Sequence, residues 1–307
     1  MNLNPITNDL LRIVSGFKGA FKGAYNIREN GQCAGRQSSE NIQIDSLTDR
    51  PGLAIRVKPG TKGETVYIPA CVTQGGVEDL VYNDFYIGEG ADVVIVAGCG
   101  VHTEDGHDAR HNGIHRFFLE KGAHVVYKEK HVGTGAGSGG KTIDPVTDLQ
   151  LAEDAVFEMD SVQLSGVDAT LRKTTAHVGP RAKVLVRERI MTDGVEAAKT
   201  DFDVFLEGED SGADLVSRSV AKGRSRQEFV SRIRGACRCT GHSECDAILA
   251  GDATVIATPA LEAAHIDASL IHEAAIGKIA GEQLLKLCTL GLTEEQAEER
   301  IIAGFLK

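Results

Sequence analysis

The sequence has no tryptophan, and its aromatic side chains make up only 5% of 307 residues. It also has no apolar stretch long enough to cross a bilayer, and no charged-then-apolar start typical of a signal peptide. Basic residues are in deficit, with 33 against 44 acidic residues and a formal net charge of −11. Binding to nucleic-acid phosphates or to an anionic membrane surface would need the opposite balance. We therefore expect a cytoplasmic protein that binds neither nucleic acid nor membrane.

Glycine and cysteine, by contrast, are well represented. The 35 glycines make up roughly 11% of the chain, against an average near 7%. Many turn residues combined with few bulky side chains favour short strands over large packed helices. The seven cysteines are Cys33, Cys71, Cys99, Cys237, Cys239, Cys245 and Cys288. An odd number in a chain of this length indicates free thiols in a reducing compartment, some of them reactive or metal-binding.

The middle of the chain, residues 41–271, has the pattern of successive short strands without helical periodicity. A loose repeat recurs there, in which a turn residue and an alanine precede an apolar strand. Its copies are Gly90–Val93, Gly122–Val125, Asp168–Leu171, Arg181–Val184, Gly212–Leu215 and Asp267–Leu270. A small residue at each corner, followed by a short inward-facing strand, is what stacked coils require. The sequence therefore predicts a mainly β protein with a β-helix core, and an ordinary β-sandwich is the alternative.

The two ends of the chain have a different pattern. Residues 1–40 begin with an amphipathic, partly helical stretch that contains Leu10, Leu11, Ile13 and Val14. Near the other end, four apolar residues share one helical face: Ile276, Ala280, Leu284 and Leu287. Gly291 follows as the residue that ends this helix, and Thr293 with Gln296 forms the capping-box pattern of a second one. We therefore expect a C-terminal helical hairpin within residues 272–307.

Four segments after residue 213 are similar to motifs of one protein family, and they occur in the family's order. They are Leu215–Gly223 (LVSRSVAKG), Glu244–Leu249 (ECDAIL), His272–Leu284 (HEAAIGKIAGEQL) and Gly291–Phe305 (GLTEEQAEERIIAGF). The similarity extends over roughly residues 80 to 307. Because several motifs in order are far more specific than any single one, the chain resembles the SufB/SufD family of the SUF iron–sulfur cluster assembly system.

This resemblance implies both a fold and a function. The fold is a right-handed parallel β-helix with a C-terminal helical cap. The function is that of a scaffold, and not of an enzyme, on which a transient iron–sulfur cluster is assembled. ATP would be hydrolysed only by a partner, a SufC-like ABC ATPase docked on the helical region, and a sulfur donor protein would be a further partner. Since the chain combines SufB-like and SufD-like features, the resemblance also implies a homodimer formed through the β-helix.

The resemblance also assigns site residues. Cys245 matches the family's cluster-forming cysteine, and thiolates are the ligands that iron–sulfur clusters require. Glu273 matches the acidic residue that partners this cysteine, and a carboxylate is a hard ligand suited to iron, or a base for the thiol. His272 matches a neighbouring histidine that would assist. On the residues alone, His272 and Glu273 could equally form the polar N-terminus of a helix.

Further candidate ligands surround these positions. Cys237, Cys239 and His242 lie within nine residues of sequence that end at Cys245, and they are candidate auxiliary ligands. On pattern alone this group could equally hold zinc or consist of buried strand cysteines. Cys99 lies in a context similar to that of the family's sulfur-accepting cysteine. Receiving sulfur as a persulfide requires an accessible thiol of low pKa.

A histidine-rich stretch contains His102, His107, His111 and His115. On a helix, the four-residue spacing of the last three would stack their imidazoles for a metal ion. Gly106, Asn112 and Gly113 oppose a helix at this place. We expect a loop with solvated or hydrogen-bonded histidines, and a metal site is the alternative.

The segment Gly135–Thr142 (GAGSGGKT) fits the phosphate-binding loop of nucleotide hydrolases, with Lys141 as the phosphate-binding lysine. That loop requires a strand before it and a helix after it. Pro145 opposes a helix in the place where one is needed. We therefore expect a flexible glycine-rich loop, and the rival functions are a P-loop hydrolase using Lys141 and a metal-free β-solenoid adaptor.

Overall fold

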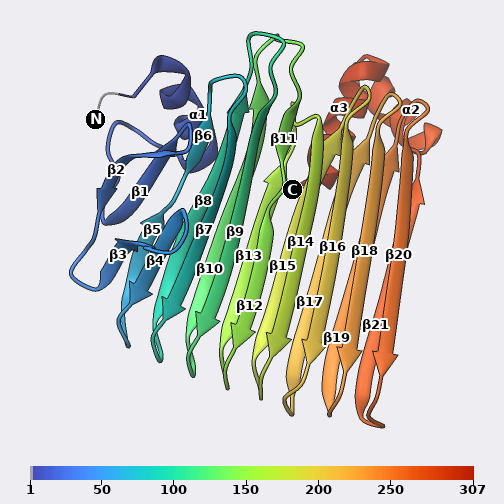
Figure 1. Cartoon of the computed structure of the whole chain (residues 1–307). Helices are drawn as coiled ribbons and strands as arrows, with labels where there is room; N and C mark the ends of the chain where they lie inside the picture. Colours follow the sequence, from blue (N-terminus) through green and yellow to red (C-terminus); the bar gives the residue numbers. More distant parts are fainter. Residues whose placement is uncertain (1–2) are drawn as a thin grey trace.

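The computed structural model describes residues 3–307. Strands make up 57% of the protein and stack as a β-solenoid of about 8 turns, with helices at both ends (Figure 1). The prediction of a mainly β, coiled architecture is confirmed, and the β-sandwich alternative is wrong. Among the described residues, no helix is both long and apolar enough to cross a membrane.

The strands form two long sheets. In spatial order, the first sheet contains β2 (Gln32–Gln37), β1 (Ala24–Glu29), β5 (Lys62–Tyr67), β8 (Asp92–His102), β10 (His124–Thr134), β13 (Val156–Gln163), β15 (Lys183–Thr192), β17 (Ser211–Ala221), β19 (Cys239–Leu249) and β21 (Ala268–Gly277), with β6 (Ala70–Val72) beside β1 and β8. The second contains β20 (Thr254–Ala263), β18 (Arg226–Gly235), β16 (Ala197–Leu206), β14 (Ala169–Val178), β11 (Lys141–Ile143), β9 (Ala109–Leu119), β7 (Glu78–Ile87), β4 (Gly52–Val57) and β3 (Ile42–Ser46), with β12 (Val146–Leu151) beside β9 and β14.

Neighbouring strands pair in parallel throughout the solenoid, and residues one coil apart lie side by side. His124 lies opposite Asp92, 32 positions earlier, whereas His242 lies opposite Asp214, 28 positions earlier. Antiparallel pairing is limited to the hairpins β1–β2 and β3–β4. The first hairpin lies within residues 1–40, where only a helical stretch was expected, because its polar sequence gives no apolar alternation.

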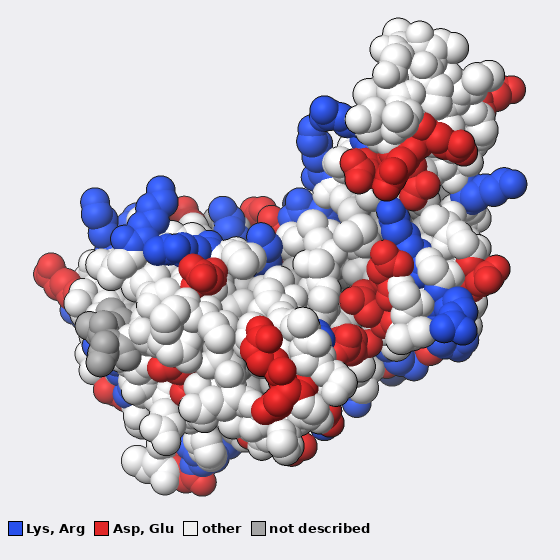
Figure 2. All heavy atoms as spheres, turned by 90° about the horizontal axis from the view of Figure 1, so that it is seen from above, with Lys and Arg blue, Asp and Glu red and all other residues white. Residues whose placement is uncertain are grey.

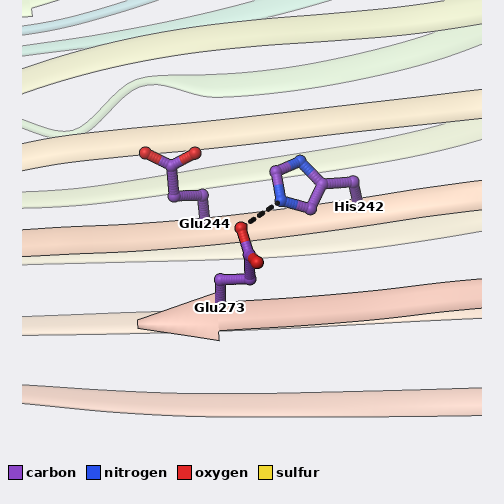
Figure 3. Close-up of side chains that lie close together, drawn as sticks. All are labelled: His242, Glu244 and Glu273. Atoms are coloured by element: carbon purple, nitrogen blue, oxygen red, sulfur yellow. Dashed lines mark ion pairs between the residues drawn. The ribbon is translucent and has the colours of Figure 1, made fainter. Parts of the chain in front are cut away.

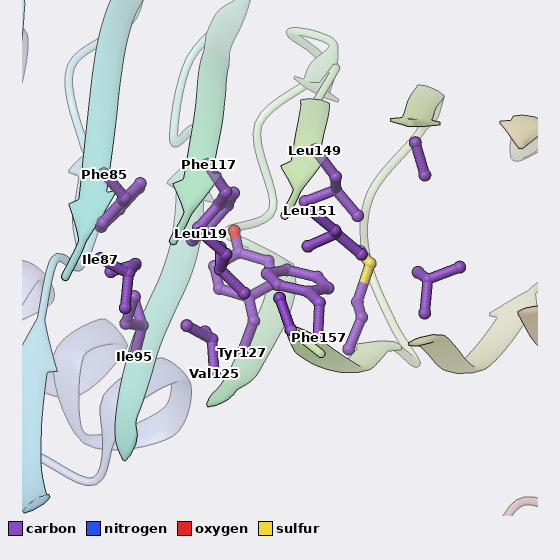
Figure 4. Close-up of a cluster of buried hydrophobic side chains, with 14 of the residues drawn as sticks. Phe85, Ile87, Ile95, Phe117, Leu119, Val125, Tyr127, Leu149, Leu151 and Phe157 are labelled. Carbon is purple, nitrogen blue, oxygen red and sulfur yellow. The ribbon is translucent and has the colours of Figure 1, made fainter. Parts of the chain in front are cut away.

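The core runs along the inside of the coils, since alternate residues of each strand point inward. Phe85 and Phe117 stack with ring centroids 4.4 Å apart, and Phe157 packs edge-on against Phe117 at 4.9 Å (Figure 4). Three alanines of the sequence repeat, Ala91, Ala123 and Ala182, lie just before their strands and are fully buried. A small side chain at these corners lets the backbone turn tightly while the next strand contributes to the core.

The helix α1 (Pro5–Ser15) covers the outer face of the first sheet near its N-terminal end, over β6, β8 and β10. Asn4 caps it by accepting a hydrogen bond from the Thr7 amide at 2.7 Å. The helix lies against β8, where a Cβ atom on Gly98 would approach the Val14 carbonyl oxygen to 2.5 Å. Only glycine therefore permits this helix to lie so close to the strand.

Two helices, α2 (Gly281–Thr289) and α3 (Glu294–Phe305), follow the last coil. Thr293 and Gln296 form the predicted capping box, and Gly291 has the expected positive φ of 96° between the helices. The assignment of Ile276 to the helical face is wrong, because β21 continues to Gly277. Pairing with β19 holds this segment in the extended form despite its helix-like spacing of apolar residues.

Candidate functional site

The last two coils contain most of the candidate residues, on the adjacent strands β19 and β21. Since successive side chains of a strand point to opposite faces, Cys245 points into the solenoid, whereas His242 and Glu244 point outward. Register then determines where the residues of β21 lie: His272 pairs with Ser243, and Glu273 pairs with Glu244. The alternation of side chains along each strand therefore separates the candidates into an inner and an outer group.

The inner group contains Cys245 and His272. Cys245 is 1% exposed, and burial, with a smaller contribution from the charge of Glu188, raises the pKa of its thiol to about 12. His272 is half-buried on the same face of the sheet, and its Nδ1 atom has no hydrogen-bond partner among residues 3–307. A buried imidazole nitrogen without a partner is costly, so it is available as a ligand or a proton acceptor.

The outer group contains His242, Glu244 and Glu273. Figure 3 shows the three side chains as neighbours, with an ion pair in which the His242 Nε2 atom lies 3.4 Å from Glu273 Oε2. One potential ligand atom from each residue lies within 4.8 Å of the others. The structure thus does not bring Glu273 together with Cys245, because the two side chains leave the sheet on opposite faces.

Neighbouring charges shape the outer group. His242 Nδ1 lies 2.8 Å from Asp214 Oδ1, and this hydrogen bond, reinforced by Glu273, raises the pKa of His242. Burial and the adjacent Asp246 raise the pKa of Glu244. Sequence analysis missed Glu244 and Asp214, although the spacing of two between His242 and Glu244 already places them on one face of a strand.

The other cysteines of this segment do not join Cys245. Cys239 lies six residues before it on the same strand, which corresponds to about 20 Å at roughly 3.3 Å per residue. Cys237 lies at a corner of the coil, where its thiol donates to the Gly208 carbonyl at 2.9 Å. Both are buried within the main apolar core. The alternative of a zinc site made from all these residues is therefore wrong, and burial explains Cys237 and Cys239.

Cys99 is also an interior residue, on β8. Burial, with a contribution from the charge of Glu129, raises the pKa of this thiol well above its ordinary value. The accessible thiol of low pKa that persulfide chemistry requires is therefore not present in this conformation. Its neighbour one coil further is His131, which is itself buried.

A line of buried polar groups runs inside the solenoid from this region towards Cys245. His131 Nε2 lies 3.3 Å from Glu129, and Arg172 bridges Glu129 at 2.6 Å and Glu188 at 3.3 Å. Glu188 then accepts a hydrogen bond from Ser217 at 2.8 Å, and Ser217 lies directly opposite Cys245. The line was not predicted, because its members are isolated charges on strands distant in sequence.

Electrostatics differ between the two carboxylates of this line. Burial alone would raise the pKa of Glu129, but the charges of Arg172 and His131 outweigh it and hold the pKa well below its ordinary value. Burial raises the pKa of Glu188, and Arg172 offsets this only in part. The interior therefore holds one firmly ionised carboxylate and one that takes up a proton more readily, with the latter nearer to Cys245.

The histidine-rich stretch is mostly strand, so the prediction of a loop is wrong for three of its four members: His102 ends β8, and His111 and His115 lie in β9. His111 and His115 point inward from β9, where His111 contacts Asp79 at 3.1 Å and His115 contacts the Tyr127 hydroxyl at 3.0 Å. Burial lowers the pKa of His115 to about 4, so it is neutral near pH 7. A separation of four residues is two periods of a strand, so His111 and His115 point to the same face. The ring of each of these two histidines is satisfied by a hydrogen bond and not by a metal.

The glycine-rich segment is not a phosphate-binding loop. The strand β11, and not a helix, follows Lys141. The amides that would face a phosphate are already used: Gly137 donates to the Thr103 carbonyl at 3.0 Å and Gly139 to the Asp105 carbonyl at 3.0 Å. The Lys141 ammonium is buried and lies 3.4 Å from Asp168. The P-loop hydrolase reading is therefore wrong.

Comparison with known proteins agrees with the motifs of the last coils. Residues 81–305 match the family model described as SUF system FeS cluster assembly, SufBD core domain. An iron–sulfur cluster assembly SufBD family protein of Methanothermobacter thermautotrophicus is 31% identical over 260 residues, which cover 83% of this chain and 62% of that protein. A SufBD family protein of Archaeoglobus fulgidus is 30% identical over 276 residues, covering 89% of this chain and 72% of that protein.

A further relative, from Pyrococcus horikoshii, is 28% identical over 201 residues, or 65% of this chain and 60% of that protein. The chain thus spans less than two thirds of the Methanothermobacter and Pyrococcus relatives. The family model, however, covers all coils from β7 onward together with both C-terminal helices. The chain therefore belongs to the SufB/SufD family.

Proposed function

We propose that this protein is a scaffold of iron–sulfur cluster assembly, on which a nascent cluster is built with the help of a SufC-like ABC ATPase. Family membership supports a role in the assembly of these clusters. The observation that carries the proposal is the position of Cys245. This thiol faces the interior next to Ser217, at the end of the buried polar line that begins near Cys99.

In this proposal Cys245 supplies a thiolate and His272 the second ligand from the same face. Release of the Cys245 proton requires a base, because burial disfavours the thiolate. Glu188 accepts a hydrogen bond from Ser217, which lies beside the thiol, and it is the carboxylate of the polar line nearest to Cys245. Glu273 reaches the inner face only if β21 shifts, and β21 has a neighbouring strand on one side only. Cys99, at the other end of the line, is proposed to receive sulfur in a conformation that exposes its thiol, which is buried in this structure.

The C-terminal helices are proposed to dock the ATPase. α2 buries none of its side chains, and Leu285 and Leu290 are 66% and 75% exposed. Seen from above, the end of the molecule that carries α2 and α3 projects from the solenoid, and its tip has few charged side chains (Figure 2). An uncovered apolar face of this kind favours a protein partner.

A homodimer formed through the solenoid is part of the same proposal. β20 and β21 end their sheets, so each presents an unpaired edge. The last coil also exposes apolar side chains, namely Leu261, Ile266, Ile271 and Ile276. An exposed apolar edge is unstable in isolation and is commonly covered by another strand. A second copy of the chain would cover it and would bring two Cys245 sites close together.

The test is anaerobic reconstitution of the full chain with iron and sulfide, with and without the ATPase, followed by absorption and Mössbauer spectroscopy. We expect Cys245→Ser to remove the cluster chromophore without unfolding the chain, because serine is nearly isosteric. Cys71→Ser is the matched control, since Cys71 is equally buried at 1% exposure but lies far from the site. A wild-type chain that never acquires a cluster would favour the metal-free adaptor, and a normal cluster in Cys245→Ser would refute the site.

A further inference from the structure

The outer face of the last two coils carries a donor set that the cluster proposal does not use. His242 and Glu244 project from β19 and Glu273 from β21, and their ligand atoms lie within 4.8 Å of one another (Figure 3). One imidazole nitrogen and two carboxylates provide three ligands from two adjacent strands. The Glu273 side chain is 67% exposed, so water can complete the coordination of an ion bound here.

A hydrogen bond to Asp214 fixes the orientation of the His242 imidazole. The Asp214 Oδ1 atom accepts a hydrogen bond of 2.8 Å from His242 Nδ1. The other ring nitrogen, Nε2, is then directed towards the two glutamates. Asp214 is itself held by Arg187 at 2.6 Å. A carboxylate that orients the second nitrogen of a histidine is the usual supporting arrangement of metal-binding imidazoles.

The same sheet contains a near-copy of this arrangement that lacks one ligand. Near the N-terminal end, His124 lies 3.1 Å from Asp92 and 2.9 Å from Glu158, again across three neighbouring strands. The residue two positions after His124 is Val126, whereas the residue two positions after His242 is Glu244. His124 already satisfies both ring nitrogens with exposed carboxylates, which is the pattern of a surface ion-pair ladder.

Glu244 distinguishes the two arrangements. It is only partly exposed and has no ion pair with any of residues 3–307, although Asp246 and Glu273 place further negative charge beside it. Without a bound ion, the neighbouring carboxylates of Glu244, Asp246 and Glu273 would repel one another, and Arg218 offsets this repulsion at Glu244 only in part. A bound divalent ion would remove this repulsion, and the His124 ladder has no comparable excess of charge.

The geometry points to a binding site for a divalent first-row metal ion at His242, Glu244 and Glu273, on the face of the sheet opposite Cys245. Mixed nitrogen and carboxylate ligands suit ions such as Fe²⁺. The identification of this ion as ferrous iron rests on the proposed function, in which iron is a substrate. The sheet then separates a hard outer site for the free ion from a soft inner thiolate, so that an iron ion is bound on the opposite face of the strand that carries Cys245.

The test titrates the purified full chain with Co²⁺ alone, whose absorption spectrum reports the type of ligand. We expect one saturable site with a spectrum of nitrogen and oxygen ligands and without thiolate charge transfer. Glu244→Gln and His242→Gln should abolish this site, and Asp214→Asn should weaken it by about 10- to 100-fold. His124→Gln is the matched control and should bind Co²⁺ as the wild type does.

Two results would overturn the inference. Equal loss in His124→Gln and His242→Gln would show that general surface charge attracts the ion, and retained binding in Glu244→Gln would remove the third ligand. Cys245→Ser should keep the Co²⁺ site, and its loss there would also count against an outer site. A chain that binds Co²⁺ as expected but never assembles a cluster would refute the proposed function and leave the metal site intact.

Discussion

Arg172 provides a strong test of the interior polar line, because it bridges Glu129 and Glu188. It is 4% exposed and contacts the two carboxylates at 2.6 Å and 3.3 Å. Arg172→Leu would leave Glu188 buried without its cation, and Glu129 with His131 as its remaining ion-pair partner. Breaking a buried ion pair from one side typically costs about 3–5 kcal/mol of unfolding free energy. At roughly 2–4 °C per kcal/mol, the melting temperature should fall by about 6–20 °C.

The dependence of this loss on pH has a definite sign. In the wild type the folded-state pKa of Glu129 is lowered, so its stabilising contribution is complete above the unfolded pKa of roughly 4.3 and is lost as the pH falls through the folded value. In Arg172→Leu, burial would dominate and raise the folded pKa of both glutamates. Their ionisation above pH ~4.3 then destabilises the variant. The difference in melting temperature should therefore widen between pH 4 and pH 7.

Thermal unfolding followed by circular dichroism at several pH values measures both effects. Arg238→Leu is the control, because Arg238 also bridges two carboxylates, Glu209 and Asp210, but on the exposed surface. Exposed ion pairs contribute little, so this variant should unfold close to the wild type at every pH. If Arg172→Leu were no less stable than Arg238→Leu, or if its loss were largest at low pH, the account of the polar line would be refuted.

Three further predictions concern other parts of the molecule. Lys141→Ala should leave cluster assembly and ATP turnover by the partner unchanged, and tight ATP binding by the isolated wild-type chain would contradict this. Deletion of Thr293–Lys307 should abolish co-purification with the ATPase while circular dichroism still shows the solenoid; unchanged binding would exclude α3 from the docking surface. Gly98→Ala should destabilise the protein by about 1–3 kcal/mol in denaturant titrations, because its new Cβ meets the backbone of Val14, and an unaltered midpoint would mean that α1 moves away freely.

The repeat of a turn residue, an alanine and an apolar strand correctly predicted corners that lie directly before strands of the first sheet. Ala91, Ala123 and Ala182 are all fully buried at such corners. Ala155 is an equivalent corner that was not counted in the repeat, although Asp154 precedes it as a turn residue with a φ of 60°. Ala169 was counted in the repeat but belongs to β14 of the second sheet, which explains the irregular spacing. Short motifs identify corners but do not assign them to a sheet.

The candidate site was only partly predictable for a related reason. Within one strand, parity follows from the sequence, so the opposite directions of His242 and Cys245 could have been predicted from their separation of three residues. Between strands, the face to which a residue points depends on the length of the coil that joins them. A change of one residue in that length would turn every side chain of the next strand to the opposite face. The coil from Glu244 to Glu273 pairs these two residues and directs both outward. The family motif named Glu273 as a candidate but gave no information about its face.

This division of faces has a chemical consequence for the order of assembly. A free thiolate beside exposed iron in water would be open to oxidation and to the wrong metal, whereas Cys245 is buried and protonated until a base acts on it. The outer donors, by contrast, are accessible and already carry negative charge. Iron would therefore bind first outside, and the thiol would become a ligand only when the last coil opens. Because β21 has one strand neighbour and carries both His272 and Glu273, movement of this single strand would connect the two sites.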